Sequence, residues 1–150
     1  MKNILISGAG VGGPALAYWL HRYNYNVTIV EKASAVRKGG YRIDIRGAAV
    51  TVVDQMGLLE AIRENATAML GSSFVNRNGK RTINLDNPDL FGMREKQDVE
   101  IMRGDLVDIL YRSTKEYTSY VFDESITGIS HIVNGVEVTF QNGITKTYDL

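Results

Sequence analysis

The feature that most constrains the fold is the glycine cluster Gly8-Ala9-Gly10-Val11-Gly12-Gly13 near the start of the chain. A short apolar run, Ile4-Leu5-Ile6, precedes it, which is the pattern of a strand buried on both faces of a parallel sheet. Pro14 suits the first turn of a following helix, and Asn24 tolerates the left-handed conformation at its end. Val27-Thr28-Ile29-Val30 then has the pattern of a second buried strand. These residues predict one β-α-β unit with a right-handed crossover.

The glycine spacing matches G-x-G-x-x-G at Gly8, Gly10 and Gly13. The first glycine permits a tight turn, the second lets a pyrophosphate approach the backbone, and the third lets helix and strand pack closely. The helix N-terminus then offers free N–H groups and its positive dipole end. Glu31 ends the second strand, where a carboxylate can accept hydrogen bonds from ribose hydroxyls. The pattern predicts dinucleotide binding, and the alternative is that the glycines serve only a tight β-α turn.

The identity of the dinucleotide needs other evidence, because NAD and FAD share the adenosine half. A carboxylate at Glu31 repels a 2′-phosphate, so NADP is disfavoured in this particular pocket. The spacing of the β-α-β unit leaves NAD and FAD open. The residues that follow Glu31 must decide between them.

The next part of the chain mixes strand and helix signals. An alternating segment from Tyr41 to Arg46 predicts a strand with Arg42, Asp44 and Arg46 on one face. A helical pattern from Ala48 to Ile62, interrupted at Gly57, predicts two short helices or one broken helix. Its expected buried positions are Val52, Val53, Met56, Leu59 and Ile62.

Turn signals organise the second half. Asn78-Gly79 predicts a hairpin whose two central residues have positive φ, and the polar stretch from Asp86 to Asp98 predicts a loop. Glu100-Ile101-Met102 predicts a short strand before a helix from about Asp105 to Lys115. After a strand at Ser119-Tyr120-Val121-Phe122, three apolar segments separated by Asn134-Gly135 and Asn142-Gly143 predict an antiparallel meander.

Composition excludes several function classes. Seventeen basic residues balance seventeen acidic ones, so no net field draws the chain to nucleic acid or to an anionic membrane. The absence of cysteine excludes disulfides, thiolate metal sites and a cysteine nucleophile. The first residues lack the apolar region of a signal peptide, and no run suits a membrane helix. We expect a cytoplasmic protein that acts on a small molecule, and a homo-oligomer stays open.

Two blocks carry a specific resemblance. The stretch Gly39-Gly40-Tyr41-Arg42-Ile43-Asp44-Ile45-Arg46-Gly47, followed by Met56-Gly57-Leu58-Leu59, resembles the segment after the Rossmann acid in certain flavin monooxygenases. These are the FAD-dependent enzymes related to para-hydroxybenzoate hydroxylase and to the tetracycline-degrading monooxygenases. The run from Ile101 to Leu110 is similar to the family's arginine-led helix start, R-x-x-L. With the glycine motif, the blocks occur in the family's order and cover essentially the whole chain.

The resemblance implies an α/β fold: a Rossmann-type FAD/NAD(P)-binding parallel sheet with an antiparallel β meander. It implies that Glu31 holds the adenosine ribose and that Asp44 contacts FAD beside its ring-bearing half. Arg103 falls at the arginine that family members use on FAD, and a guanidinium is a bidentate partner for its oxygens. The predicted cofactor-binding residues are Gly8, Gly10, Val11, Gly12, Gly13, Glu31, Lys32, Arg42, Asp44 and Arg103.

Structural interpretations stand beside these roles. Asp44 is also suited to be a solvated strand residue paired to its neighbouring arginines, and Arg103 to be an ordinary polar residue at a helix start. Arg42 and Arg46 share the face of Asp44 and are candidates for the flavin or for the phosphates of a nicotinamide cofactor. A structural role is the favoured interpretation for these two arginines.

Family members continue beyond Tyr148-Asp149-Leu150 into segments that close over the flavin and a sheet domain that covers the substrate. We therefore expect residues 1–150 to form the incomplete N-terminal portion of an FAD-binding domain, without the substrate domain and with an exposed sheet edge. The implied activity is hydroxylation of a small aromatic or polyketide-like substrate with NAD(P)H and O₂, and the fragment alone is expected to be inactive. The cofactor carries that chemistry, so we predict no catalytic residue and no metal ligand. The alternatives are an NAD-dependent oxidoreductase and a non-catalytic nucleotide-binding fragment.

Overall fold

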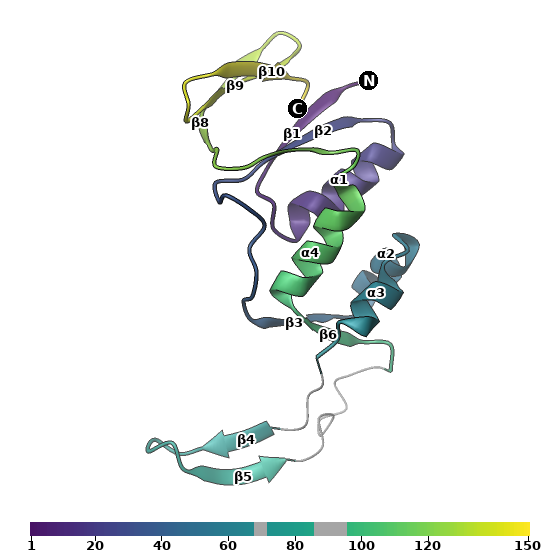
Figure 1. The fold of residues 1–150 in the computed structure, drawn as a ribbon, viewed down its shortest axis with the longest axis vertical. Coiled ribbons are helices and arrows are strands. Elements are labelled where there is room, and N and C mark those ends of the chain that lie inside the picture. Colours follow the sequence, from purple (N-terminus) through teal and green to yellow (C-terminus); the bar gives the residue numbers. More distant parts are fainter. Residues whose placement is uncertain (68–71, 86–95) are drawn as a thin grey trace. The chain divides into compact units, whose positions relative to one another are not determined.

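The computed structural model describes residues 1–67, 72–85 and 96–150 (Figure 1). The chain divides into two compact units, one formed by Met1–Gly40 with Arg103–Leu150 and the other by Tyr41–Met102. Throughout the described ranges, no helix combines the length and the apolar character that crossing a bilayer requires.

The first unit begins with the predicted β-α-β motif. Strand β1 (Asn3–Ser7), helix α1 (Gly12–Arg22) and strand β2 (Asn26–Val30) follow one another, and the two strands pair in parallel. Strand β7 (Ser119–Val121) joins β2 in parallel, which gives the order β1-β2-β7. The side chains of Ala17 and Ile29 are fully buried between helix and sheet. The prediction of a parallel Rossmann-type sheet is confirmed.

Helix α4 (Arg103–Thr114) lies beside α1 (Figure 1). It begins before the predicted Asp105, because strand β6 (Val99–Met102) runs into it without an intervening loop. Leu106, Val107 and Leu110 are buried as predicted, while Ile109 is half-buried.

The predicted meander is present at the end of the chain. Strands β8 (Ile126–Ile132), β9 (Gly135–Phe140) and β10 (Thr145–Tyr148) form an antiparallel sheet in the order β10-β9-β8. Val138 and Phe140 of β9 pack against Val30 of the parallel sheet. Strand β1 lies at one edge of that parallel sheet, where the N–H of Asp149 donates to the carbonyl of Asn3 at 2.9 Å.

The second unit contains two antiparallel strand pairs and two short helices. Strand β3 (Arg42–Ile45) pairs with β6, and β4 (Ser72–Val75) pairs with β5 (Arg81–Leu85). Helices α2 (Ala48–Gln55) and α3 (Leu59–Glu64) are separated at Gly57, whose φ is 72°.

One predicted buried position in these helices is wrong. Val53, Met56 and Ile62 are buried and Leu59 is half-buried, but Val52 is 40% exposed. The buried stripe of α2 instead runs through Val50, Val53 and Met56, three residues apart. Val52 precedes Val53 by one residue and therefore lies about 100° around the helix from it.

The hairpin at Asn78-Gly79 is confirmed, but its turn differs from the prediction. Only Gly79 has positive φ (74°), and its N–H donates to the carbonyl of Asn76 at 2.9 Å. A three-residue loop of this kind places a type I turn before a left-handed glycine, so Asn78 needs no positive φ. Of the predicted loop from Asp86 to Asp98, residues 86–95 lie outside the described residues.

Candidate functional site

The glycine loop joins β1 to α1 by a close turn. Gly8 has a φ of 104°, and its N–H donates to the carbonyl of Val30 at 2.7 Å. A Cβ on Gly13 would collide with the carbonyl oxygen of Gly8 and would lie 3.5 Å from Cγ2 of Ile6. These two glycines therefore have the turn-forming and close-packing roles that their spacing predicts.

The carboxylate of Glu31 is fixed by backbone N–H groups. Its Oε2 accepts the N–H of Ala9 at 2.8 Å, and its Oε1 accepts the N–H of Ala33 at 2.9 Å. Burial opposes ionisation, but the N–H groups of Ala33 and Ala9 and the charges of Arg37 and Lys32 outweigh it. The pKa of Glu31 therefore lies below its ordinary value of 4.5. Glu31 is an ionised acceptor at neutral pH, beside the glycine loop.

A pocket of about 230 Å³ opens next to Glu31 and the glycine loop. The residues that line it are Ala9, Gly10, Glu31, Lys32, Val36, Arg37, Arg103 and Val107. One carboxylate and three cationic side chains give this lining an excess of positive charge, which suits a pyrophosphate. Complete ligand sites usually enclose about 300–1,000 Å³, so a pocket of this size accommodates part of a dinucleotide.

Arg103 reaches the glycine loop from the first residue of α4. A Cβ built on Gly10 would lie 3.2 Å from Nη2 of Arg103. The missing side chain at Gly10 thus leaves room for the guanidinium beside backbone N–H groups. A diphosphate needs such a cradle, because its oxygens accept from both kinds of donor.

The structure brings together four of the predicted residues, since Gly10, Glu31, Lys32 and Arg103 line the same pocket. Gly8 lines a neighbouring hollow of about 320 Å³, to which Glu31 and Lys32 also contribute. Val11, Gly12 and Gly13 form the start of α1, with Val11 at its N-cap.

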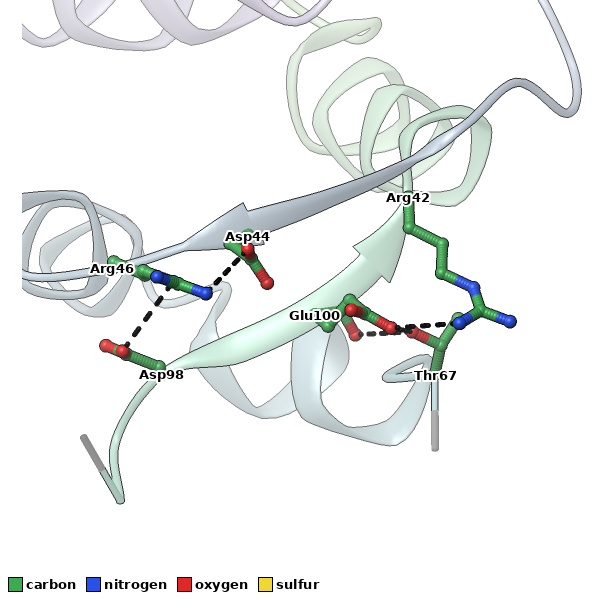
Figure 2. A network of polar contacts seen from close by, with 6 residues as sticks. All are labelled: Arg42, Asp44, Arg46, Thr67, Asp98 and Glu100. Atoms are coloured by element: carbon green, nitrogen blue, oxygen red, sulfur yellow. Dashed lines mark hydrogen bonds and ion pairs between the residues drawn. The ribbon is translucent and has the colours of Figure 1, made fainter. Parts of the chain in front are cut away.

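The predicted residues Arg42 and Asp44 belong to the second unit and lie on β3. Polar contacts there link β3, β6 and Thr67, which lies three residues beyond the end of α3 (Figure 2). Arg42 Nη1 lies 3.6 Å from Oε1 of Glu100, and Thr67 Oγ1 donates to the same oxygen at 2.6 Å. The side chain of Glu100 is 6% exposed, whereas that of Arg42 is 56% exposed. A buried carboxylate therefore holds a largely exposed guanidinium.

Arg46 forms the other half of this network. Its Nη2 lies 2.8 Å from Oδ2 of Asp44, and its Nε lies 3.8 Å from Oδ2 of Asp98 (Figure 2). Asp44 is thus paired to one of its neighbouring arginines, Arg46, as its structural interpretation predicts. Contacts of Asp44 and Arg42 with a cofactor remain predictions.

Sequence reasoning did not single out several residues of the site. Ala9 and Arg37 face the pocket, and the only signal for Arg37 is that a basic pair, Arg37-Lys38, follows soon after Glu31. Outside the pocket, the sequence indicates only a strand position for Glu100. Its pairing with Thr67 depends on chain segments far apart in the sequence, so no local pattern reveals it.

No family model matches the chain, but curated proteins match it over nearly its whole length. An uncharacterized protein of Mycobacterium tuberculosis is 40% identical over all of this chain, which spans 41% of that protein. A flavin-dependent monooxygenase of Legionella longbeachae is 39% identical over 99% of this chain, which spans 38% of that protein.

Solved structures also match nearly the whole of this chain. The tetracycline destructase Tet(51) is 35% identical with a TM-score of 0.85, over 100% of this chain and 37% of that one. CtdE, solved in complex with FAD, has the same fold at 20% identity, with a TM-score of 0.79 over 99% of this chain and 37% of that one.

The chain thus spans about two fifths of the length of the curated relatives it matches. The match includes the β-α-β unit, the glycine loop and the meander, since it extends over nearly all of this chain. In sequence and in fold, the chain corresponds to the N-terminal part of the flavin-dependent monooxygenases.

Proposed function

We propose that this chain binds FAD as the N-terminal portion of the FAD-binding domain of a flavin-dependent monooxygenase. In the proposed complex, the glycine loop and Arg103 hold the pyrophosphate, and Glu31 accepts hydrogen bonds from the adenosine ribose. Lys32 lies at the same pocket. A contact of Asp44 with FAD, and one of Arg42 with the flavin or with the phosphates of a nicotinamide cofactor, are further parts of the proposal. The complete enzyme would use NAD(P)H and O₂ to hydroxylate a small aromatic or polyketide-like substrate.

The observation that carries this proposal is the convergence of Gly10, Glu31 and Arg103 on one pocket. Donors for a diphosphate lie beside an acceptor for a diol, which is the arrangement of the adenosine diphosphate half of a dinucleotide. Flavin rather than nicotinamide is supported by the 39% identity to a flavin-dependent monooxygenase across nearly the whole chain.

Bound FAD would supply the redox chemistry, and the chain's own residues would bind and orient it. The N–H groups at the start of α1 and the Arg103 guanidinium neutralise phosphate charge. The Glu31 carboxylate, already fixed by Ala9 and Ala33, presents its remaining lone pairs to hydroxyl groups. This division of roles requires no nucleophile and no metal ligand in this part of the protein.

The first test is the visible absorbance spectrum of the purified full chain after incubation with FAD and removal of free cofactor. We expect a retained flavin spectrum, and the same treatment with NAD is expected to leave no bound nucleotide. Retention of NAD with no flavin would replace this proposal with an NAD-dependent oxidoreductase. Retention of neither would favour a non-catalytic fragment.

A second test addresses the activity of the complete enzyme. Oxidation of NADH and NADPH and consumption of O₂ are measured with and without candidate substrates. The substrate panel includes a tetracycline, because Tet(51) is 35% identical to this chain. We expect substrate to accelerate NAD(P)H oxidation and an oxygenated product to appear by mass spectrometry. Substrate-independent oxidation without such a product would contradict the monooxygenase assignment.

A further inference from the structure

A strap of eight residues, Ala33 to Gly40, follows Glu31 and contributes one wall of the nucleotide pocket. Val36 packs against the core cluster of the first unit, and Arg37 lines the pocket. The strap contains no helix or strand. Its position therefore depends on the packing of Val36 and on the contacts at its two ends.

The first end is held by hydrogen bonds. The N–H of Ala33 donates to Oε1 of Glu31 at 2.9 Å, and its carbonyl accepts the N–H of Asp123 at 3.1 Å. These bonds fix the chain where it leaves β2. They do not restrain Arg37, which lies further along the strap.

The other end is held by a close backbone approach. Gly39 passes over Gly104, the buried second residue of α4. A Cβ on Gly104 would lie 2.6 Å from the carbonyl oxygen of Gly39 and 3.1 Å from its Cα. Backbone cannot rotate away as a flexible side chain can, so any residue other than glycine at position 104 must displace the strap.

We propose that Gly104 is a positioning residue for the nucleotide pocket: it seats the strap on α4 and thereby keeps Arg37 at the pocket wall. This inference rests on the proposed function for its ligand, an adenosine diphosphate moiety. Its physical content is a steric one, because Gly104 makes room rather than making a polar contact. The neighbouring Arg103 supplies one positive charge from α4, and Gly104 allows the strap to supply a second positive charge, that of Arg37.

Helix propensity makes the proposal easy to distinguish from a general effect on α4. Alanine is a better helix former than glycine, so Gly104→Ala would strengthen an isolated helix. Increased exposure of the strap in this variant would therefore come from the added Cβ and not from a weaker α4. The matched control is Gly128→Ala in β8, where a Cβ would meet Thr139 Cβ at an ordinary 3.6 Å.

The first experiment needs no nucleotide. Limited trypsin digestion of the full chain is followed by mass spectrometry, and cleavage after Arg37 and Lys38 is compared with cleavage after Arg77, an exposed turn residue of the second unit. We expect Gly104→Ala to raise relative cleavage of the strap by roughly tenfold. Gly128→Ala should leave it unchanged. Equal strap cleavage in wild type and Gly104→Ala would overturn the proposal.

The second experiment measures the affinity for ADP and FAD in a double-mutant cycle. Gly104→Ala should weaken binding by roughly tenfold in the wild-type background and by less than about twofold in an Arg37→Ala background, because the strap then carries no guanidinium to the pocket. Additive effects would show that Gly104 does not act through Arg37. If strap cleavage rises while wild type binds neither ligand, the proposed function fails and the steric role of Gly104 stands.

Discussion

The guanidinium of Arg103 lies over the Cα atom of Gly10: a methyl group on that glycine would be 3.2 Å from Nη2 of the arginine. Arg103→Ala therefore removes a cation from the glycine loop without filling the pocket. Hydrogen bonds to charged groups are worth about 1.5–3 kcal/mol, so FAD affinity should fall by roughly 10- to 150-fold. Titration of the full chain with FAD measures this. Arg112→Ala, an exposed residue of the same helix, should bind normally, and an unchanged affinity in Arg103→Ala would refute the contact.

Gly13 and Gly12 differ in the space around their Cα atoms. A Cβ on Gly13 would collide with the Gly8 carbonyl, whereas a Cβ on Gly12 would meet nothing within 4 Å. Gly13→Ala should lower the free energy of unfolding by about 1–3 kcal/mol, as overpacking usually does. Gly12→Ala should leave it nearly unchanged or slightly raised. Urea denaturation of both variants tests the difference, and equal stabilities would contradict the packing role of Gly13.

The carboxylate of Glu31 makes the free energy of unfolding fall as the pH becomes acidic. Its pKa in the folded chain lies below 4.5, so its ionised form stabilises the fold above that value. This contribution is lost as the pH falls through the folded pKa. At pH 7, Glu31→Gln should be less stable than wild type by about 1 kcal/mol, and the gap should close in acid. Urea unfolding at pH 7 and at a pH well below 4.5 measures the difference in stability between the two proteins. A gap that persists in acid would indicate another cause, and the exposed Glu60→Gln serves as control.

Glu100 is a buried carboxylate with Thr67 and Arg42 as partners. Glu100→Ala should lower the free energy of unfolding by about 1–3 kcal/mol, because it removes these contacts and leaves a gap beneath Arg42. Glu137→Ala, an exposed strand residue, should cost much less. Thermal unfolding of the two variants tests this. Similar melting temperatures would show that the network adds little to stability.

Tyr117 stacks on His21, with ring centroids 3.9 Å apart. Burial, with smaller effects from Tyr18 and Tyr120, raises its pKa to about 12 from 10.0. The unfolded chain then loses its proton first, so stability should fall as the pH rises between these values. Tyr117→Phe should reduce this fall and keep the ring stack. Unfolding in urea at about pH 9 and about pH 11 measures it, with the exposed Tyr23→Phe as control. An unaltered pH dependence would exclude Tyr117 as its source.

Local patterns predicted much of this fold. The glycine motif between two buried apolar runs predicted β1, α1 and β2, since turn geometry and burial on both strand faces act over neighbouring residues. Asn-Gly pairs located the hairpins for the same reason. The dipeptide does not fix the turn type, because a three-residue loop and a two-residue loop can both contain it.

The sequence by itself determined the glycine loop and Glu31 as candidates, because each stands at a fixed place relative to a strand or helix end, and the family resemblance added Arg103. Only the tertiary structure decided that Arg103 reaches Gly10, that Gly39 crosses Gly104, and that β3 pairs with β6. These contacts join segments far apart in the chain. Which distant segments meet depends on the burial of whole apolar faces and on how closely two backbone segments can approach. A local sequence pattern predicts neither of these.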